Sequence, residues 1–419
     1  MGTERGKDCL IIGGGVAGFQ AALTCRRRWP DKSVAIVDGE REVGYYRSLM
    51  PQFMAGALGE EQLFFWREGQ DPLLTVWSGA AVKLLDRANR VAVLDSGAAV
   101  SYERLILAQG GQADRPGLTR EMKARGVFTV RDLTTARKTR HWLSEHRPKI
   151  IVLGASLVAV KTAVHLRQAG YPVALLARRN HVLLRVLTPG AAQEVESHLR
   201  RLGIELLLGC EPDDYQTRAG DLTALHINGA WHPCGTLLVA AGATPDTSFL
   251  TGTDLLAGGE LRVSANLQTR DERIFAAGDV ATIQLAGGVT VSPRTWPEAV
   301  AQGKLAAENL YRPALLSRQY FSRVNALELH GLPLVILGPP VPGAQVVSCR
   351  DIRDGVWREV FLVDGRIQGG ALIGDISGAG VLQSMMAGAR PVRDEGFLQP
   401  GRQAINSPGI RERAARSRI

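Results

Sequence analysis

The stretch from Asp8 to Phe19 constrains the fold more than any other part of the chain. A short apolar run leads into three glycines and then into an amphipathic segment. Gly13 allows a tight turn from a strand into a helix, Gly15 lets the backbone approach a phosphate closely, and Gly18 lets the helix pack against its strand. The amides at the start of such a helix, including those of Val16 and Ala17, bind the pyrophosphate of a dinucleotide.

A second apolar strand follows, and it ends at Asp38 and Gly39. A carboxylate at this position accepts hydrogen bonds from the hydroxyls of an adenosine ribose. A glycine pattern of this kind on its own is more often an ordinary turn. Here strand, glycine turn, helix, strand and acid follow in order within about forty residues, which favours a dinucleotide site.

Length and composition limit the class of protein. A chain of 419 residues is long enough for two or three domains, and its content of 45% hydrophobic and 22% charged residues is that of a globular protein. No apolar run approaches the roughly 20 residues that span a bilayer. The first apolar segment runs directly into the glycine turn, which does not resemble a signal peptide. We therefore expect a cytoplasmic protein that does not bind membranes.

Cysteine spacing and charge narrow the choice of partners. The five cysteines form no CxxC pair and no metal-ligand spacing, so we assign no metal site and expect structural thiols in a reducing compartment. The net charge of +9 favours an acidic partner, although a solvated basic surface and the arginines from Arg411 to Arg418 are an alternative source of this charge. No basic helix interleaved with aromatic residues indicates nucleic-acid binding.

A second copy of the opening pattern begins at Lys149. It comprises an apolar strand, a turn at Gly154, a helix from Leu157 to Gln168 and a further strand. Ser156 and Ala159 replace the second and third glycines, and small residues at these positions still permit close approach. The chain therefore contains two dinucleotide-binding units and is predicted to be an α/β protein.

The second strand of this copy ends without an acid. Arg178 and Arg179 stand there, and Arg185 follows. An arginine fork at this position suits a ribose 2′-phosphate, so the sequence favours NADPH over NADH. Solvated loop arginines are the alternative interpretation.

Other candidate cofactor residues follow strands or begin helices that the chain order places beside the first dinucleotide. The loop from Gly44 to Gly56, the short strands from Ala80 to Val100 and the strand from Leu105 to Ala108 supply several of them. A strand at Thr236 to Ala240 is expected to return the chain to the first domain. The candidates are Arg47, Ser48, Ala81, Val82, Ala108, Gln109, Gly110, Gly242, Gly278, Asp279, Trp296 and Ala299.

The C-terminal part changes to strands. Asp364-Gly365 between two apolar segments predicts a hairpin, and a helix near Val381 to Ala387 completes a small α+β domain. We expect a discontinuous domain for the first dinucleotide over 1–118 and 236–315, an NAD(P)-binding domain over 119–235 and the small domain over 316–392. Residues 393–419 are expected to form a flexible basic tail.

Five short motifs recur in a characteristic order along the chain: Tyr46-Arg47, Leu107 to Gly110, Ala241 to Pro245, Ala276 to Asp279 and Trp296 to Gly303. With these motifs, the chain resembles the FAD/NAD(P)-dependent pyridine nucleotide-disulphide oxidoreductase superfamily over roughly residues 8 to 390. The motifs are most similar to those of the branch of NADH:rubredoxin reductase and the flavin portion of assimilatory nitrite reductase. The resemblance implies two Rossmann-like domains for FAD and NAD(P). It also implies an oxidoreductase that passes electrons to a protein acceptor, a small acidic rubredoxin- or ferredoxin-like protein or an iron–sulphur subunit.

Two departures from this family are informative. Ser48 stands where relatives that reduce disulphides or peroxide carry a cysteine, so we expect electrons to leave directly from the flavin. Lys161 stands where relatives carry a glutamate, and we expect it to offer positive charge to the reduced flavin, with a solvent-facing lysine as the alternative. A flavin-binding subunit or regulator without NAD(P)H turnover and an NAD(P)H oxidase that uses oxygen are the alternative functions.

Overall fold

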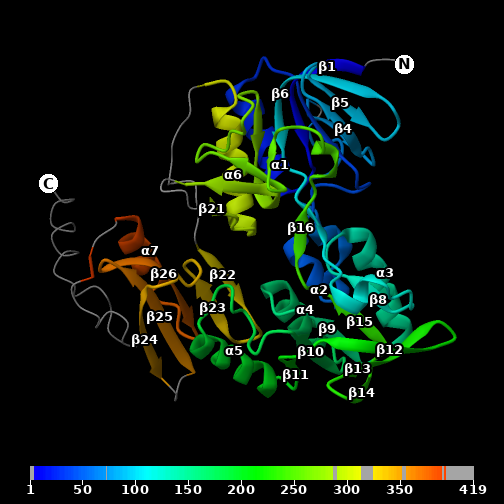
Figure 1. Cartoon of the computed structure of the whole chain (residues 1–419), viewed down its shortest axis with the longest axis vertical. Helices are drawn as coiled ribbons and strands as arrows, with labels where there is room; N and C mark the ends of the chain where they lie inside the picture. Colours follow the sequence, from blue (N-terminus) through cyan, green and yellow to red (C-terminus); the bar gives the residue numbers. More distant parts are fainter. Residues whose placement is uncertain are drawn as a thin grey trace. The chain divides into compact units, whose positions relative to one another are not determined.

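The computed structural model describes residues 4–71, 73–285, 290–312, 324–351, 355–388 and 391–392 (Figure 1). They form two compact units. Unit 1 draws on the ranges Met1–Pro116, Thr129–Glu145 and Gly242–Ser322, and unit 2 on Gly117–Phe128, His146–Ala241 and Arg323–Ile419. The predicted basic tail, 393–419, lies outside the described residues. In the described part of the chain, no helix is both long and apolar enough to cross a bilayer.

A seven-stranded sheet forms the centre of unit 1. Its order is β3-β2-β1-β6-β5-β4, and β19 also pairs with β6. β1, β2, β3, β6 and β19 pair in parallel. The apolar runs of β1, β2, β6 and β19 are almost fully buried because parallel strands are covered on both faces, whereas β3 is half-buried. The strands are β1 (Glu4–Ile12), β2 (Val34–Asp38), β3 (Thr75–Ser78), β4 (Val82–Asp86), β5 (Val91–Leu94), β6 (Ala99–Leu107) and β19 (Ile274–Ala276).

Two helices of unit 1, α1 (Val16–Arg28) and α6 (Trp296–Asn309), lie side by side (Figure 1). Gly303 permits their close approach, since a Cβ atom there would lie 2.2 Å from the carbonyl oxygen of Ala17. The indole Nε1 of Trp29 donates to the carbonyl of Ala307 at 3.3 Å. These contacts fix the middle and the last turn of α6 against α1.

The connections of unit 1 carry short elements. The helix α3 (Leu133–His146) is bound to the segment 42–60. Arg137 donates to Glu42 and Glu60, and Arg140 donates to the carbonyl of Leu58. We expected α3 to belong to the NAD(P) domain, and these ion pairs place it in unit 1 instead. The elements are η1 (Arg47–Leu49), α2 (Met50–Met54), η2 (Glu60–Leu63), β7 (Gly111–Ala113), α3 (Leu133–His146), β16 (Ala243–Pro245), η4 (Ser248–Leu250), β17 (Leu256–Ala257), β18 (Glu260–Val263), η5 (Gly278–Val280), β20 (Ala281–Gln284) and β21 (Thr290–Val291).

Unit 2 is built on a five-stranded sheet of order β11-β10-β9-β15-β8. β15 pairs in parallel with β9, so the strand expected to lead back into the first domain belongs to this sheet, and the chain enters unit 1 again only at Gly242. The elements are η3 (Gly117–Arg120), β8 (Val127–Thr129), β9 (Ile150–Leu153), α4 (Leu157–Gln168), β10 (Val173–Ala177), α5 (Pro189–Arg201), β11 (Glu205–Leu208), β12 (Pro212–Arg218), β13 (Asp221–Ile227), β14 (Ala230–Pro233) and β15 (Thr236–Val239).

The C-terminal part of unit 2 is a five-stranded antiparallel sheet with one helix. Asp364 and Gly365 have φ angles of 50° and 68°, which confirms the predicted hairpin turn. The sheet packs on α5, where a Cβ on Gly190 would lie 2.7 Å from the ring of Trp357. The elements are β22 (Asn325–Glu328), β23 (Pro333–Ile336), β24 (Gln345–Asp351), β25 (Val356–Val363), β26 (Arg366–Ile373) and α7 (Ala379–Ala387). The predicted α/β class with an α+β C-terminal part is confirmed.

Candidate functional site

The three glycines of the first turn occupy three different environments. Gly13 has a φ of +115°, and a Cβ there would lie 2.3 Å from the carbonyl oxygen of Ala108. A Cβ on Gly18 would lie 1.9 Å from the carbonyl oxygen of Gly13. A Cβ on Gly15 would meet no atom within 4 Å, and the φ of Gly15 is an ordinary −80°. The protein itself therefore requires Gly13 and Gly18, whereas Gly15 leaves space on the side where a phosphate is predicted.

The N-terminus of α1 has the features of an anion site. Its N-cap is Gly15, no side chain caps its first amides, and no acidic residue lies in its first turn. The first four amides of a helix have no partner within the helix, and the helix dipole favours negative charge there. The first turn, including Val16 and Ala17, can therefore hold the pyrophosphate of FAD.

Asp38 is fixed to the glycine turn. Its Oδ2 accepts a hydrogen bond from the amide of Gly14, and its Oδ1 accepts from the amide of Glu40 at 2.7 Å. Burial raises the pKa of the Asp38 carboxyl above its ordinary value, and the two amide bonds oppose this shift. The adjacent Gly39 faces Ala81, whose Cβ would be 3.2 Å from a Cβ on the glycine, and Val82 begins β4 next to it. The ribose contact of Asp38 stays a prediction.

The carboxyl ends of three parallel strands meet beside this turn. The amide of Ala108, after β6, donates to Ile12 of β1 at 2.7 Å, and the amide of Ala277, after β19, donates to Leu107 at 2.9 Å. Gly278 donates to Oε1 of Gln302 on α6. A Cβ on Gly278 would lie 3.0 Å from Ala17 and 3.9 Å from Ala299. The structure thus brings Gly13, Ala17, Ala108, Gly278 and Ala299 together, at the edge where open α/β sheets bind ligands.

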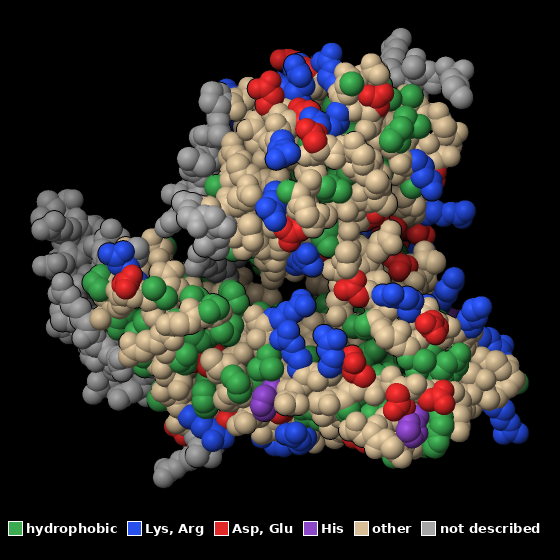
Figure 2. Space-filling view, viewed as in Figure 1, with side chains coloured by type: hydrophobic (Ala, Val, Ile, Leu, Met, Phe, Trp, Pro, Cys, Tyr) green, Lys and Arg blue, Asp and Glu red, His purple; other side chains and the backbone are tan. Residues whose placement is uncertain are grey.

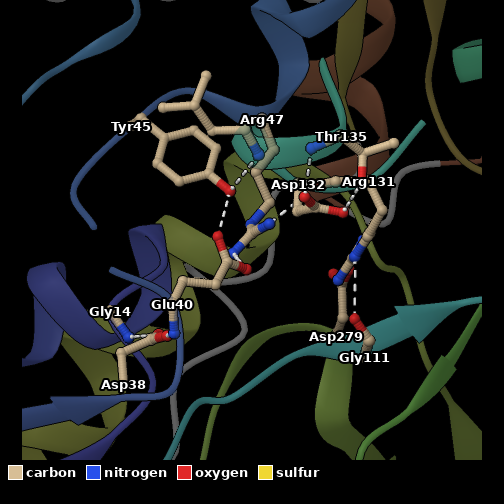
Figure 3. A network of polar contacts seen from close by, with 11 residues as sticks. Gly14, Asp38, Glu40, Tyr45, Arg47, Gly111, Arg131, Asp132, Thr135 and Asp279 are labelled. Atoms are coloured by element: carbon tan, nitrogen blue, oxygen red, sulfur yellow. Dashed lines mark hydrogen bonds and ion pairs between the residues drawn. The ribbon is translucent and has the colours of Figure 1, made fainter. Parts of the chain in front are cut away.

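Arg131 holds the next residue, Asp279, in a network drawn in Figure 3. Its Nη1 and Nη2 each lie 3.3 Å from Oδ2 of Asp279, and its Nε donates to the carbonyl of Gly111 at 3.0 Å. Sequence reasoning missed Arg131, because it lies 148 positions from its partner and belongs to no recognisable motif.

Arg47, which we expected to bind the cofactor, belongs to the same network (Figure 3). It donates to the carbonyl of Arg131 at 2.9 Å and to Oε1 of Glu40 at 2.6 Å. The hydroxyl of Tyr45 donates to Oε2 of the same glutamate, and burial raises the pKa of Tyr45, so the phenol stays protonated. Glu40 and Tyr45 were not identified from the sequence. The neighbouring Ser48 is exposed and lies in η1.

Gln109 carries an acceptor that fits a ligand. Its Nε2 donates to the carbonyl of Asp246 at 2.7 Å, whereas its Oε1 is buried and has no hydrogen-bond partner among the described residues. A buried acceptor without a donor is costly, so its presence at this edge fits a bound group with an N–H or O–H. The next residue, Gly110, has a φ of +71°, and Gly242 lies beside Asp114, whose amide donates to its carbonyl at 3.0 Å.

Trp296, the first residue of α6, is 42% exposed. Its ring lies 5.9 Å from that of Tyr46, and Tyr46 lies 5.1 Å from Phe65. Aromatic rings at these separations attract one another, so the start of α6 is held against the segment that carries Arg47.

The second glycine turn, in unit 2, differs from the first because a side chain caps the helix that follows it. Gly154 has a φ of +143°, and a Cβ there would lie 2.3 Å from the carbonyl oxygen of Ala240. Ser156 caps α4, since its Oγ accepts from the amide of Ala159 at 3.3 Å just before Leu157 begins the helix. Lys161 lies in the second turn of α4, and burial lowers its pKa. Its role at the flavin stays a prediction, because the flavin residues belong to unit 1.

Arg178 and Arg179 follow β10 and are exposed. Nη1 of Arg178 lies 3.9 Å from Oε1 of Glu211, and these side chains are 75% and 52% exposed. An ion pair of this kind contributes little to stability. Both arginines therefore remain accessible to a phosphate, and the predicted contact with a 2′-phosphate stays a prediction.

The segment between Gly44 and Gly56 contains no cysteine. Cys9 and Cys25 are fully buried with sulfur atoms 3.7 Å apart, and the Cys25 contact and burial raise the pKa of Cys9. Cys210 and Cys234 are buried, and Cys349 is half-buried on β24. Within the described ranges, no group of three His, Cys, Asp or Glu residues could hold a metal ion.

Comparisons with known proteins agree with this geometry. A family model described as pyridine nucleotide-disulphide oxidoreductase matches residues 7–303. The chain is similar to the ferredoxin–NAD(+) reductase component of the biphenyl dioxygenase system of Paraburkholderia xenovorans, with 26% identity over 82% of this chain and 84% of the relative. It is also similar to an NADH oxidase of Methanocaldococcus jannaschii, with 25% identity over 78% and 75%. Its fold is similar to the covalent putidaredoxin reductase–putidaredoxin complex, with a TM-score of 0.87 and 19% identity over 99% and 100% of the chains.

Proposed function

This chain belongs to the pyridine nucleotide-disulphide oxidoreductase family, and we propose that it carries electrons from NADPH, through FAD, to a small acidic iron–sulphur protein without a redox-active cysteine. FAD-dependent NAD(P)H oxidoreductase activity follows from family membership, as the sequence motifs predicted. The choice of NADPH, the acceptor and the direct exit of electrons from the flavin are the proposed parts. The observation that best supports FAD binding is the open space at Gly15, the N-cap of α1, together with the absence of a side chain that caps the first amides of this helix.

The residues of unit 1 that fit FAD divide into three groups. The first turn of α1 offers amides to the phosphates, Asp38 is the proposed ligand of the ribose, and Asp279 and Gln109 offer oxygen acceptors. When bound, FAD supplies the capacity to accept a hydride and to release electrons one at a time. The protein contributes orientation and charge around it.

The proposal of NADPH rests on Arg178 and Arg179, which follow β10 where an acid would favour a free ribose hydroxyl. We expect wild type to use NADPH at least about tenfold more efficiently than NADH, since a charge-assisted phosphate contact is worth about 1.5–3 kcal/mol. The Arg178→Ala, Arg179→Ala double variant should lose this preference and keep its NADH rate. Anaerobic stopped-flow bleaching at about 450 nm measures both rates. Equal wild-type rates would contradict the choice of NADPH, and no bleaching of bound flavin would favour a subunit without NAD(P)H turnover.

The proposed acceptor rests on charge and on the ferredoxin reductase relative. The chain carries a net charge of +9. On the face seen in Figure 2, Lys and Arg side chains are distributed over both units among Asp and Glu. Attraction to an acidic carrier therefore arises from the summed electrostatic potential of the protein and not from one basic patch. This attraction weakens as salt screens the charges.

The acceptor is tested with an acidic [2Fe–2S] ferredoxin, a rubredoxin and oxygen, each supplied with NADPH. We expect ferredoxin reduction to fall about tenfold in kcat/KM between roughly 0.05 and 0.5 M KCl, because steered association depends steeply on ionic strength. A salt-independent rate would contradict an acidic partner. Because a relative is an NADH oxidase, oxygen consumption that matches NADPH consumption, with slow reduction of both proteins, would favour an oxidase instead.

A further inference from the structure

The segment 178–188, here named the coenzyme loop, connects β10 to α5 and carries Arg178, Arg179 and Arg185. Its backbone is fixed at both ends. The carbonyl of Arg179 accepts from the amide of Gly209 at 3.1 Å. At the other end, the amide of Thr188 donates to Oε1 of Glu359 at 3.2 Å, and its hydroxyl donates to Oε2 of the same residue.

The middle of the coenzyme loop is held by a buried carboxylate. Glu196 on α5 is only 3% exposed, and its Oε1 accepts from the amide of Val182 at 3.0 Å. The same oxygen lies 3.1 Å from Nδ1 of His181. A carboxylate is rarely buried to this extent unless its partners satisfy it, and here two of these partners belong to the loop.

Leu183 shows that the loop is held in one conformation. It is 2% exposed and has a φ of 59°, in the left-handed region that a bulky residue rarely adopts. Its amide donates to the carbonyl of Ala155 in the second glycine turn at 2.8 Å, and its own carbonyl accepts from Val186 and Leu187. Such strain persists only where the surroundings over-determine the backbone, and it concentrates at ligand clamps.

We propose that Glu196 is a positioning residue for coenzyme selection. It holds the coenzyme loop, together with the strained Leu183, so that Arg178 and Arg179 stand ready for a 2′-phosphate. An arginine on a loop that is already ordered loses less entropy on binding, and this gain applies only to a ligand that the arginines contact. The inference rests on the proposed preference for NADPH.

The test is calorimetric titration of the FAD-loaded full chain with 2′,5′-ADP and with 5′-AMP, which differ by the 2′-phosphate alone. We expect the ratio of their affinities to fall about tenfold in Glu196→Ala, whereas 5′-AMP binding changes by less than about twofold. Glu196→Gln should keep most of the ratio, because its amide oxygen still accepts from Val182. If Glu196 served only the stability of the fold, its loss would weaken the binding of 2′,5′-ADP and of 5′-AMP equally.

The matched control is Glu194→Ala. Glu194 lies on the same helix, is 14% exposed and pairs with Arg350 at 2.7 Å, so its loss should leave the ratio unchanged. If Glu196→Ala does not fold, Glu196→Asp, whose shorter side chain withdraws from Val182, should lower the ratio about threefold.

The outcomes separate the two proposals. A folded Glu196→Ala or Glu196→Asp variant that keeps the wild-type ratio overturns the positioning role, while a ratio lost in Arg178→Ala, Arg179→Ala still supports the proposed function. A wild-type protein that binds both ligands equally overturns the NADPH preference, and the positioning role fails with it.

Discussion

The Gly18→Ala variant is expected to purify with little bound FAD and with a lowered melting temperature. The added methyl would lie 1.9 Å from the carbonyl oxygen of Gly13, and both groups belong to backbone that cannot rotate away. α1 must therefore shift from β1, at about 1–3 kcal/mol for an overpacked core. FAD binding requires the unshifted helix, so the affinity for FAD should fall by about 10- to 100-fold, as the same free energy implies. The measurements are the flavin-to-protein absorbance ratio and thermal unfolding of the FAD-free protein.

Gly15→Ala is the matched control in the same turn. No atom lies within 4 Å of the new methyl and the φ of −80° suits alanine, so unfolding of the FAD-free protein should match wild type. FAD affinity should still fall, since the methyl occupies the side from which the phosphates approach. A Gly15→Ala protein with undiminished FAD would show that the pyrophosphate does not lie at this turn. Gly18→Ala with wild-type flavin content and stability would show that α1 can move at no cost.

Local signals account for the parts of the fold that the sequence predicted well. α4 spans the predicted residues Leu157–Gln168, because an apolar strand, a glycine turn and an N-capping serine all occur within a few positions. α6 begins at Trp296, where Pro297 fits the first turn of a helix. The hairpin at Asp364-Gly365 follows from the need for positive φ at both positions.

Features that depend on distant residues could not be predicted in this way. β15 is an apolar strand like any in the chain, and only its pairing with β9 assigns it to the second sheet. α3 lies in unit 1, although the sequence pattern grouped it with the second dinucleotide-binding domain, and Arg137 connects it to Glu42 and Glu60, 95 and 77 positions away. Arg131 was missed for the same reason, although Asp279 was identified from a local motif. A local pattern thus located one half of the ion pair, and only the fold supplied the other half.

Arg131→Ala is expected to weaken FAD binding about 10- to 100-fold, because hydrogen bonds to a charged group are worth about 1.5–3 kcal/mol. Both guanidinium contacts are made to Oδ2 of Asp279, so Oδ1 is not used by Arg131 and can accept a hydrogen bond from a ligand. Without Arg131 the carboxylate is free to rotate, and the carbonyl of Gly111 loses its donor. Quenching of FAD fluorescence on binding to the FAD-free protein measures this affinity. Arg131→Lys keeps the positive charge but lacks the forked guanidinium group, so its affinity for FAD should lie between those of wild type and Arg131→Ala.

A general loss of stability would also weaken FAD binding. The Arg87→Ala variant distinguishes this indirect effect from an effect of Arg131 on the cofactor. Arg87 also donates twice to one carboxylate oxygen, Oδ2 of Asp271, and its pair is 26% and 18% exposed against 22% and 27% for Arg131 and Asp279. Arg87 also pairs with Asp254, so Arg87→Ala should lose at least as much stability as Arg131→Ala, with a difference within about 1 kcal/mol. If both variants lose stability and only Arg131→Ala loses FAD affinity, Arg131 acts through Asp279 on the cofactor. If both lose affinity equally, the pair serves only the fold, and Asp279 needs no partner to hold FAD.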